Sequence, residues 1–124
     1  MDLELKEKRL ARVNNEYQSK MRRDSEYFLY HPVDEMVEEI KKMVENYKND
    51  LEKLKNFGLF DNSWWERTIE KEKEEVPYRI CKMIRKNVKE AYNQSTHPWE
   101  RKRILNVKKL ILKKLANELE PTIM

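Results

Sequence analysis

The sequence has 124 residues, a formal net charge of +4 and charged side chains at 40% of its positions. With one cysteine, one glycine and four prolines, it cannot form an internal disulfide and lacks the frequent turns of a sandwich or barrel. No apolar run approaches the roughly 20 residues of a membrane-spanning helix. These limits predict one all-α domain, residues 1–124, folded as a compact bundle of four to five helices.

The first predicted helix spans residues 3–22. Its apolar positions recur at the spacing of one helix face: Leu3, Leu10, Val13, Tyr17 and Met21. Arg23-Asp24-Ser25 interrupts that period, and the dense apolar run 27–30 follows it before Pro32. We interpret this stretch as a packed connector or a short helical turn.

A second helix is expected to begin at Pro32, because proline suits the first helical position and acidic residues follow where the backbone dipole favours them. The acidic residues are Asp34, Glu35, Glu38 and Glu39. Apolar residues keep three-four spacing from Val33 to Leu54, and Gly58 is placed to end the helix in a left-handed conformation. This is the most strongly patterned helix of the sequence.

A third helix is predicted to start after Ser63. The run Ser63-Trp64-Trp65-Glu66 has the form of a capping box, in which serine and glutamate side chains satisfy the first free backbone amides. Pro77 lacks the amide that a continuing helix would need. Either this helix kinks at Pro77, or a new helix starts there.

Two amphipathic segments end the chain. An apolar stripe runs over residues 77–92, and a wider apolar face runs over residues 98–119 after a short turn-like link. We predict that the two segments form an antiparallel helical hairpin. The apolar face of the second segment is expected to hold Ile104, Leu105, Val107, Ile111, Leu112, Leu115, Ala116 and Leu119.

Charge is divided unevenly along the chain. Residues 1–76 carry 15 Lys and Arg against 19 Asp and Glu, a net charge of −4, whereas residues 77–124 carry 12 against 4, a net charge of +8. At 100° per residue, basic side chains of both final segments fall on the face opposite the apolar one. An acidic-to-mixed N-terminal segment, residues 1–76, is thus followed by a predicted basic hairpin, residues 77–124.

Such a surface favours binding to a phosphate backbone, since each neutralised phosphate releases condensed counterions without any base-specific contact. We therefore predict a non-catalytic accessory or packaging protein that binds DNA or RNA with little sequence preference. A helix-turn-helix is not favoured, because the link between the final segments has no glycine. The residues expected to contact phosphate are Arg79, Lys82, Arg85, Lys86, Lys89, Lys102, Arg103, Lys109, Lys113 and Lys114.

The same features have other interpretations. Lys and Arg are ordinary solvated residues of amphipathic helices, and acidic stretches of the same or another chain can pair with them. The alternative function is a protein-interaction module, such as an adaptor, an inhibitor or a subunit of a larger assembly, that binds an acidic protein or a second copy. Its predicted interface is Trp64, Trp65 and Phe60, because exposed aromatic residues tend to mark interfaces. These aromatic residues can also simply close the ends of the bundle.

His31, His97 and Cys81 lie far apart in the sequence and lack metal-ligand spacing. Both histidines flank prolines at predicted helix starts, and Cys81 lies beside an apolar stripe, so each fits a structural role. We expect no metal, no cofactor, no small-molecule substrate and no enzymatic activity. Residues 1–20 are charged rather than shaped as a signal peptide, so the expected location is the cytoplasm or a particle assembled there, and not a membrane.

Overall fold

The computed structural model describes residues 3–57 and 63–118. Every regular element in these ranges is helical, which confirms the all-α prediction, and the five α-helices pack against one another. The elements are α1 (Leu3–Lys20), α2 (Ser25–Tyr30), α3 (Val33–Lys53), the short 3₁₀ helix η1 (Leu54–Phe57), α4 (Ser63–Gln94) and α5 (Pro98–Glu118).

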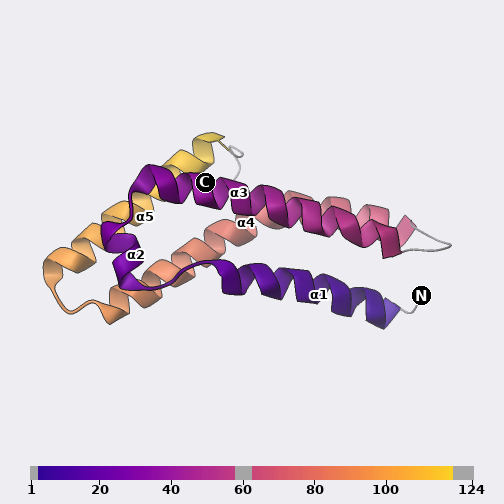
Figure 1. The fold of residues 1–124 in the computed structure, drawn as a ribbon, viewed down its shortest axis with the longest axis horizontal. Coiled ribbons are helices and arrows are strands. Elements are labelled where there is room, and N and C mark those ends of the chain that lie inside the picture. Colours follow the sequence, from indigo (N-terminus) through magenta and orange to yellow (C-terminus); the bar gives the residue numbers. More distant parts are fainter. Residues whose placement is uncertain (1–2, 58–62, 119–124) are drawn as a thin grey trace.

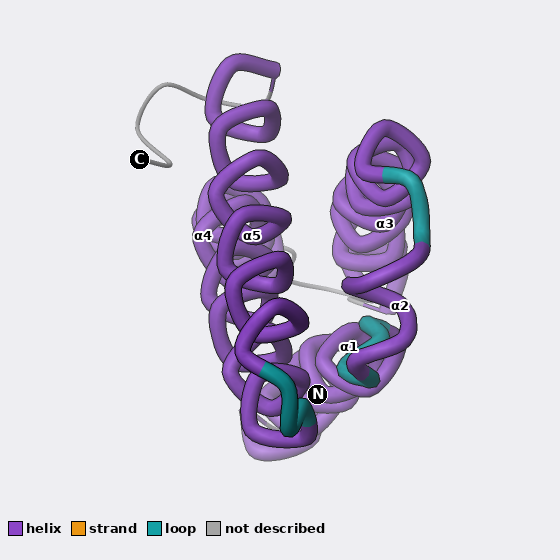
Figure 2. The backbone as a smooth tube through the Cα atoms, turned by 90° about the vertical axis from the view of Figure 1, so that its left-hand side faces the viewer, coloured by secondary structure: helices purple, strands orange, loops and turns teal. Residues whose placement is uncertain are grey.

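Helices α1, α3 and α4 run along the length of the molecule, and α2 and α5 lie toward one end of it (Figure 1). Viewed from that end, α4 and α5 form one side, α3 forms the other, and α1 lies below α3 (Figure 2). Helix α4 contacts α2, α3 and α5, whereas α1 packs chiefly on α3. None of the described helices combines the length and apolarity needed to cross a membrane.

The short stretch between α1 and α3 is the helix α2, as one of the two sequence interpretations proposed. The side chain of Asp24 caps it by accepting a hydrogen bond from the Tyr27 amide at 3.3 Å. Its middle residues, Tyr27, Phe28 and Leu29, are buried. A six-residue helix has little stability of its own, so this burial is what holds α2 in place.

Helix α3 starts at Val33, one residue later than predicted, with Pro32 as its N-cap. The Met36 amide bonds to the Pro32 carbonyl at 3.0 Å, and Asp34 and Glu35 occupy the first turn. The helix buries six residues, and it tightens into η1 at Leu54. The predicted helix end at Gly58 lies outside the described residues.

Helix α4 continues unbroken through Pro77, so no new helix starts there. Val76 and Pro77 are both buried, and apolar residues of α4 face the core on either side of them. Proline costs a helix interior about 3 kcal/mol, and burial of the flanking turns offsets that cost. The first arm of the predicted hairpin is therefore the second half of a 32-residue helix that begins at Ser63.

One cluster of buried side chains, to which all five α-helices contribute, forms the core. Helix α5 contributes Ile104, Val107, Ile111 and Leu115. The expectation that Leu105 belongs to the same apolar face is wrong, because Leu105 is 40% exposed. Trp99 and Leu110 are also exposed, so α5 presents apolar side chains to solvent as well as to the core.

Helix α1 is held on α3 by a stacked pair of tyrosines. The rings of Tyr17 and Tyr47 lie 4.4 Å apart and nearly parallel, and both side chains are buried. The Tyr17 hydroxyl donates a hydrogen bond to Asp50, and the Tyr47 hydroxyl donates one to Asn14. Burial and the Asp50 carboxylate raise the pKa of Tyr17 well above its usual range, so its hydroxyl remains a donor at neutral pH.

Candidate functional site

Seven of the ten basic residues singled out from the sequence are exposed and have no partner among residues 3–57 and 63–118, either in an ion pair or in a side-chain hydrogen bond. Four lie on α4 and three on α5. Their charges are therefore available to an external partner. The seven residues are Lys82, Arg85, Lys86, Lys89, Lys102, Lys109 and Lys113.

The other three basic residues contact neighbouring parts of the chain. Arg103 Nε donates a hydrogen bond of 2.7 Å to the Leu29 carbonyl, which ties α5 to α2. Lys114 pairs with Asp34 at the start of α3. These two side chains hold helices together, which the helical period alone could not show, because their partners come from distant parts of the sequence.

Arg79 is the third engaged residue. Its guanidinium pairs with Glu72 and, at 3.0 Å between Nη2 and Oε2, with Glu75. Burial by itself would lower the pKa of Arg79, but the hydrogen bonds to Glu72 and Tyr47 outweigh it and leave the pKa raised. Arg79 thus stays charged, with its charge balanced by acids of its own helix.

A basic cleft of about 290 Å³ lies between α4 and the end of α1. Its basic lining residues are Arg23, Arg79, Lys82 and Lys86, joined by the amide side chains of Gln18 and Asn87. Among the described residues, no carboxylate lines it. The cleft therefore concentrates positive charge and hydrogen-bond donors in a concave site.

Asn87 is a buried residue in the wall of this cleft. Its side chain is buried, and its Nδ2 donates to the carbonyls of Met21 and Arg22, at 3.3 Å each. A buried amide must find such partners or destabilise the fold. The two bonds fix the connector after α1 to α4, and Arg23 is the next residue along that connector.

Local sequence patterns do not mark Arg23 and Gln18 as parts of a basic site. In the sequence, Arg23 appears only as an interruption of the helical period. Both residues reach the cleft because α1 ends beside the second half of α4, where Asn87 bonds the connector, and no local pattern in the sequence encodes that approach.

A second concave site of about 340 Å³ lies on the outer side of α5 near the start of α3. Trp99 and Leu110 provide exposed apolar surface there, and Lys102 and Arg103 provide charge. Trp99 was not among the predicted interface residues, although Pro98 before it marks a helix start. An exposed tryptophan beside cations is a typical feature of interaction sites.

The two tryptophans of the predicted aromatic interface pack within the fold. Trp65 is fully buried, and Trp64 is partly buried and packs edge-on against it, with the ring centroids 4.9 Å apart. Lys6 of α1 lies over the Trp64 ring. Both tryptophans therefore serve the packing of α4 in this structure, and Phe60 lies outside the described residues.

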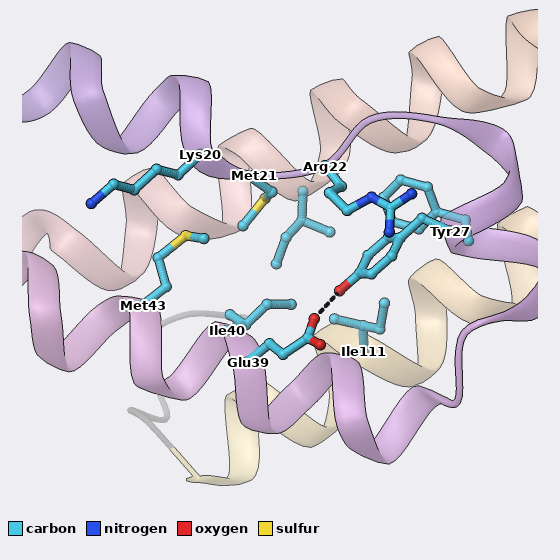
Figure 3. Close-up of a pocket in the computed structure, with 10 residues that line it drawn as sticks. Lys20, Met21, Arg22, Tyr27, Glu39, Ile40, Met43 and Ile111 are labelled. Atoms are coloured by element: carbon cyan, nitrogen blue, oxygen red, sulfur yellow. Dashed lines mark hydrogen bonds between the residues drawn. The ribbon is translucent and has the colours of Figure 1, made fainter.

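A smaller cavity of about 70 Å³ lies where α1, α2 and α3 meet (Figure 3). The Tyr27 hydroxyl points to Glu39 and donates a hydrogen bond of 2.6 Å, while Arg22 stacks over the Tyr27 ring. Burial and Glu39 raise the pKa of Tyr27 well above its usual range. Most other lining side chains, such as Met21 and Ile40, are apolar, so this cavity belongs to the core.

The two histidines occupy helix links. His31 stacks on Tyr27 and contacts Glu35 and Glu39 at 3.5 and 3.1 Å. His97 is exposed just before α5, and its carbonyl accepts a bond from the Arg101 amide. In the two described ranges, no group of three His, Cys, Asp or Glu side chains is placed to hold a metal ion.

Cys81 is buried, and burial raises the pKa of its thiol. Because the thiolate is the reactive form, we expect native protein to react with a disulfide reagent such as DTNB far more slowly than unfolded protein. The measurement is the rate of thionitrobenzoate release with and without denaturant at neutral pH. Equal rates in the two conditions would show that the Cys81 thiol is accessible in the native protein.

Comparisons of the chain with protein-family models, with curated proteins and with solved structures found no match. The function is therefore inferred from the residues of this chain.

Proposed function

We propose that this protein binds nucleic acid without catalysing a reaction, through phosphate contacts made by α5 and by the half of α4 after Pro77. These two segments would act together as a basic hairpin. The observation that supports the proposal is the set of seven exposed cations on α4 and α5 that no described ion pair engages. Such cations release the counterions condensed on a nucleic acid when they bind its phosphates.

The proposed contact set is narrower than the one predicted from the sequence. Arg79, Arg103 and Lys114 are left out of it, because each contacts an acid or a carbonyl of the chain itself. Breaking these contacts would cost some of the energy that binding provides. The seven remaining cations are expected to supply strong salt dependence and little base preference.

Salt dependence is the first prediction of this proposal. With six to ten phosphate contacts, affinity should fall by about 10³ to 10⁵-fold between about 50 and about 200 mM salt. Fluorescence anisotropy of labelled DNA and RNA, both single-stranded and double-stranded, would measure it. Absence of binding to all of these at the lower salt would contradict the proposal.

A charge-reversal variant locates the binding surface. The variant Lys82→Glu, Arg85→Glu, Lys109→Glu, Lys113→Glu should lose most of the affinity. The matched control reverses four exposed cations elsewhere, with the same change in net charge: Arg12→Glu, Lys42→Glu, Arg67→Glu, Lys71→Glu. If both variants lose affinity equally, net charge and not the surface of α4 and α5 would be responsible.

A protein-interaction module is the second candidate. The exposed Trp99 in the second concave site, on α5, favours it. Here the cations Lys102 and Arg103 would meet an acidic protein surface, and Trp99 would be its apolar anchor. In that case, Trp99→Ala should abolish partner capture, whereas nucleic-acid binding should be absent from the wild-type protein.

A further inference from the structure

The cations around the basic cleft differ in how far they are free to meet a ligand. Lys82 and Lys86 are exposed, lie one helical turn apart on α4, and have no ion-pair partner in the described ranges. Arg79 is already paired with Glu72 and Glu75. The open positive charge of the cleft is therefore carried by the two lysines and by Arg23.

Arg23 faces the two lysines from the connector after α1. Its Nε lies 3.9 Å from Glu90 Oε2, and both side chains are at least 37% exposed. An exposed pair at this separation contributes little stability, so an incoming anion can replace Glu90. The Gln18 amide of α1 adds a neutral donor on the same side as Arg23.

The cations line the cleft from two segments, α4 and the connector after α1, so an anion in the cleft would contact both of them. Arg23 presents a planar guanidinium, which suits two phosphate oxygens at once, and each lysine adds a point charge. The volume of about 290 Å³ is near the lower limit of small-ligand sites, which is about 300 Å³. A phosphate with part of its sugar fits this space.

Whether a phosphate can enter the cleft depends on whether the nucleic acid is single-stranded or a duplex. A duplex is stiff, with a persistence length of about 50 nm, and it carries its phosphates on a convex surface. A single strand bends readily, and proteins bind it in positively charged grooves that follow its backbone. A concave site with cations on both sides therefore favours the single strand.

We infer that the cleft between the end of α1 and α4 binds a phosphate group of single-stranded nucleic acid, with Arg23, Lys82 and Lys86 as its ligands. This inference rests on the proposed function and adds to it a preference for single strands over duplex. It also gives α1 a role in binding, since Arg23 and Gln18 lie outside α4 and α5.

The test compares one labelled single strand that has no self-complementarity with the duplex formed by adding its complement. Arg23→Gln should weaken single-strand binding by about tenfold, the size expected for losing a hydrogen bond to a charged group, and change duplex binding by less than about twofold. The pair Lys82→Gln, Lys86→Gln, which also belongs to the phosphate-contact set of α4 and α5, should weaken both forms, and the single strand more than the duplex. The matched control Lys109→Gln, Lys113→Gln, outside the cleft, should weaken both forms alike.

A second measurement does not depend on variants. In NMR titrations of the wild-type protein, the single strand should shift the side-chain amide signals of Gln18, which lines the cleft. Circular dichroism would verify that each variant keeps its helices.

The possible results separate this inference from the proposed function. If Arg23→Gln and the lysine pair weaken single strand and duplex equally, or if the Gln18 signals do not move, the cleft is not the site, and nucleic-acid binding by α4 and α5 stands. If the wild-type protein binds neither form at low salt, the proposed function fails, and the single-strand site fails with it.

Discussion

Replacing Trp65 with alanine is expected to lower the free energy of unfolding by about 3–5 kcal/mol. Trp65 is the largest fully buried side chain of the described structure, and it packs against Trp64 near the start of α4. Removing it leaves a cavity that the surrounding helices can fill only partly. Urea denaturation followed by circular dichroism at 222 nm, the usual wavelength for helix content, would measure the loss.

Trp99→Ala is the matched control for this variant. Trp99 is 57% exposed on α5, so its removal should change the free energy of unfolding by no more than about 0.5 kcal/mol. Equal losses for the two variants would contradict the placement of Trp65 in the core and Trp99 at the surface. They would also reopen the question of which tryptophan is available to a partner.

Replacing Tyr17 with alanine is expected to release α1 from α3 and to lower the free energy of unfolding by about 3 kcal/mol. The change removes the stacked contact with Tyr47 and the hydrogen bond to Asp50. Since α1 packs chiefly on α3, loss of this contact should free most of the helix. Hydrogen exchange should show loss of protection in the amides of α1, while those of α3 and α4 remain protected.

Two further variants separate the contributions of Tyr17. Tyr17→Phe keeps the ring and removes only the hydroxyl, so it should cost about 1 kcal/mol. Tyr30→Ala removes a tyrosine that is 69% exposed and should leave α1 protected. Full protection of α1 in Tyr17→Ala would show that other contacts suffice to dock this helix.

Undocking of α1 has a consequence for binding. Gln18 lies in α1 and lines the basic cleft only while α1 is packed, and Arg23 follows on the connector that leaves α1. Tyr17→Ala should therefore weaken single-strand binding although Tyr17 is not among the lining residues of the cleft. Duplex binding by the exposed cations of α4 and α5 should change much less.

Local sequence patterns were sufficient for elements whose stabilising residues are close together in the chain. In α3, a proline at the start, acids in the first turn and apolar residues at three-four spacing all favour the same helix, and the structure confirms it. The exposure of Lys82, Arg85, Lys86 and Lys89 follows in the same way, since the helical period sets them opposite the buried face of α4.

Local patterns were not sufficient where distant segments compete with them. Pro77 locally favours a break, but burial of the turns on both sides keeps α4 continuous. The sequence left two interpretations of Trp64 and Trp65, a partner interface or the packing of the bundle, and in the structure Trp65 lies in the core whereas Trp99 is exposed. Whether such a side chain is buried or exposed depends on which side of its helix packs against another helix.

The all-α class, the course of α3 and α5, and the excess of positive charge after residue 76 can all be read from the amino-acid order, because helix period and composition are properties of neighbouring residues. The engagement of Arg103 and Lys114 within the chain emerges only once the helices are packed. The same holds for the meeting of Arg23 with Lys82 and Lys86 in one cleft. Most of these contacts join segments far apart in the sequence, and their positions depend on how the helices pack to bury their apolar faces.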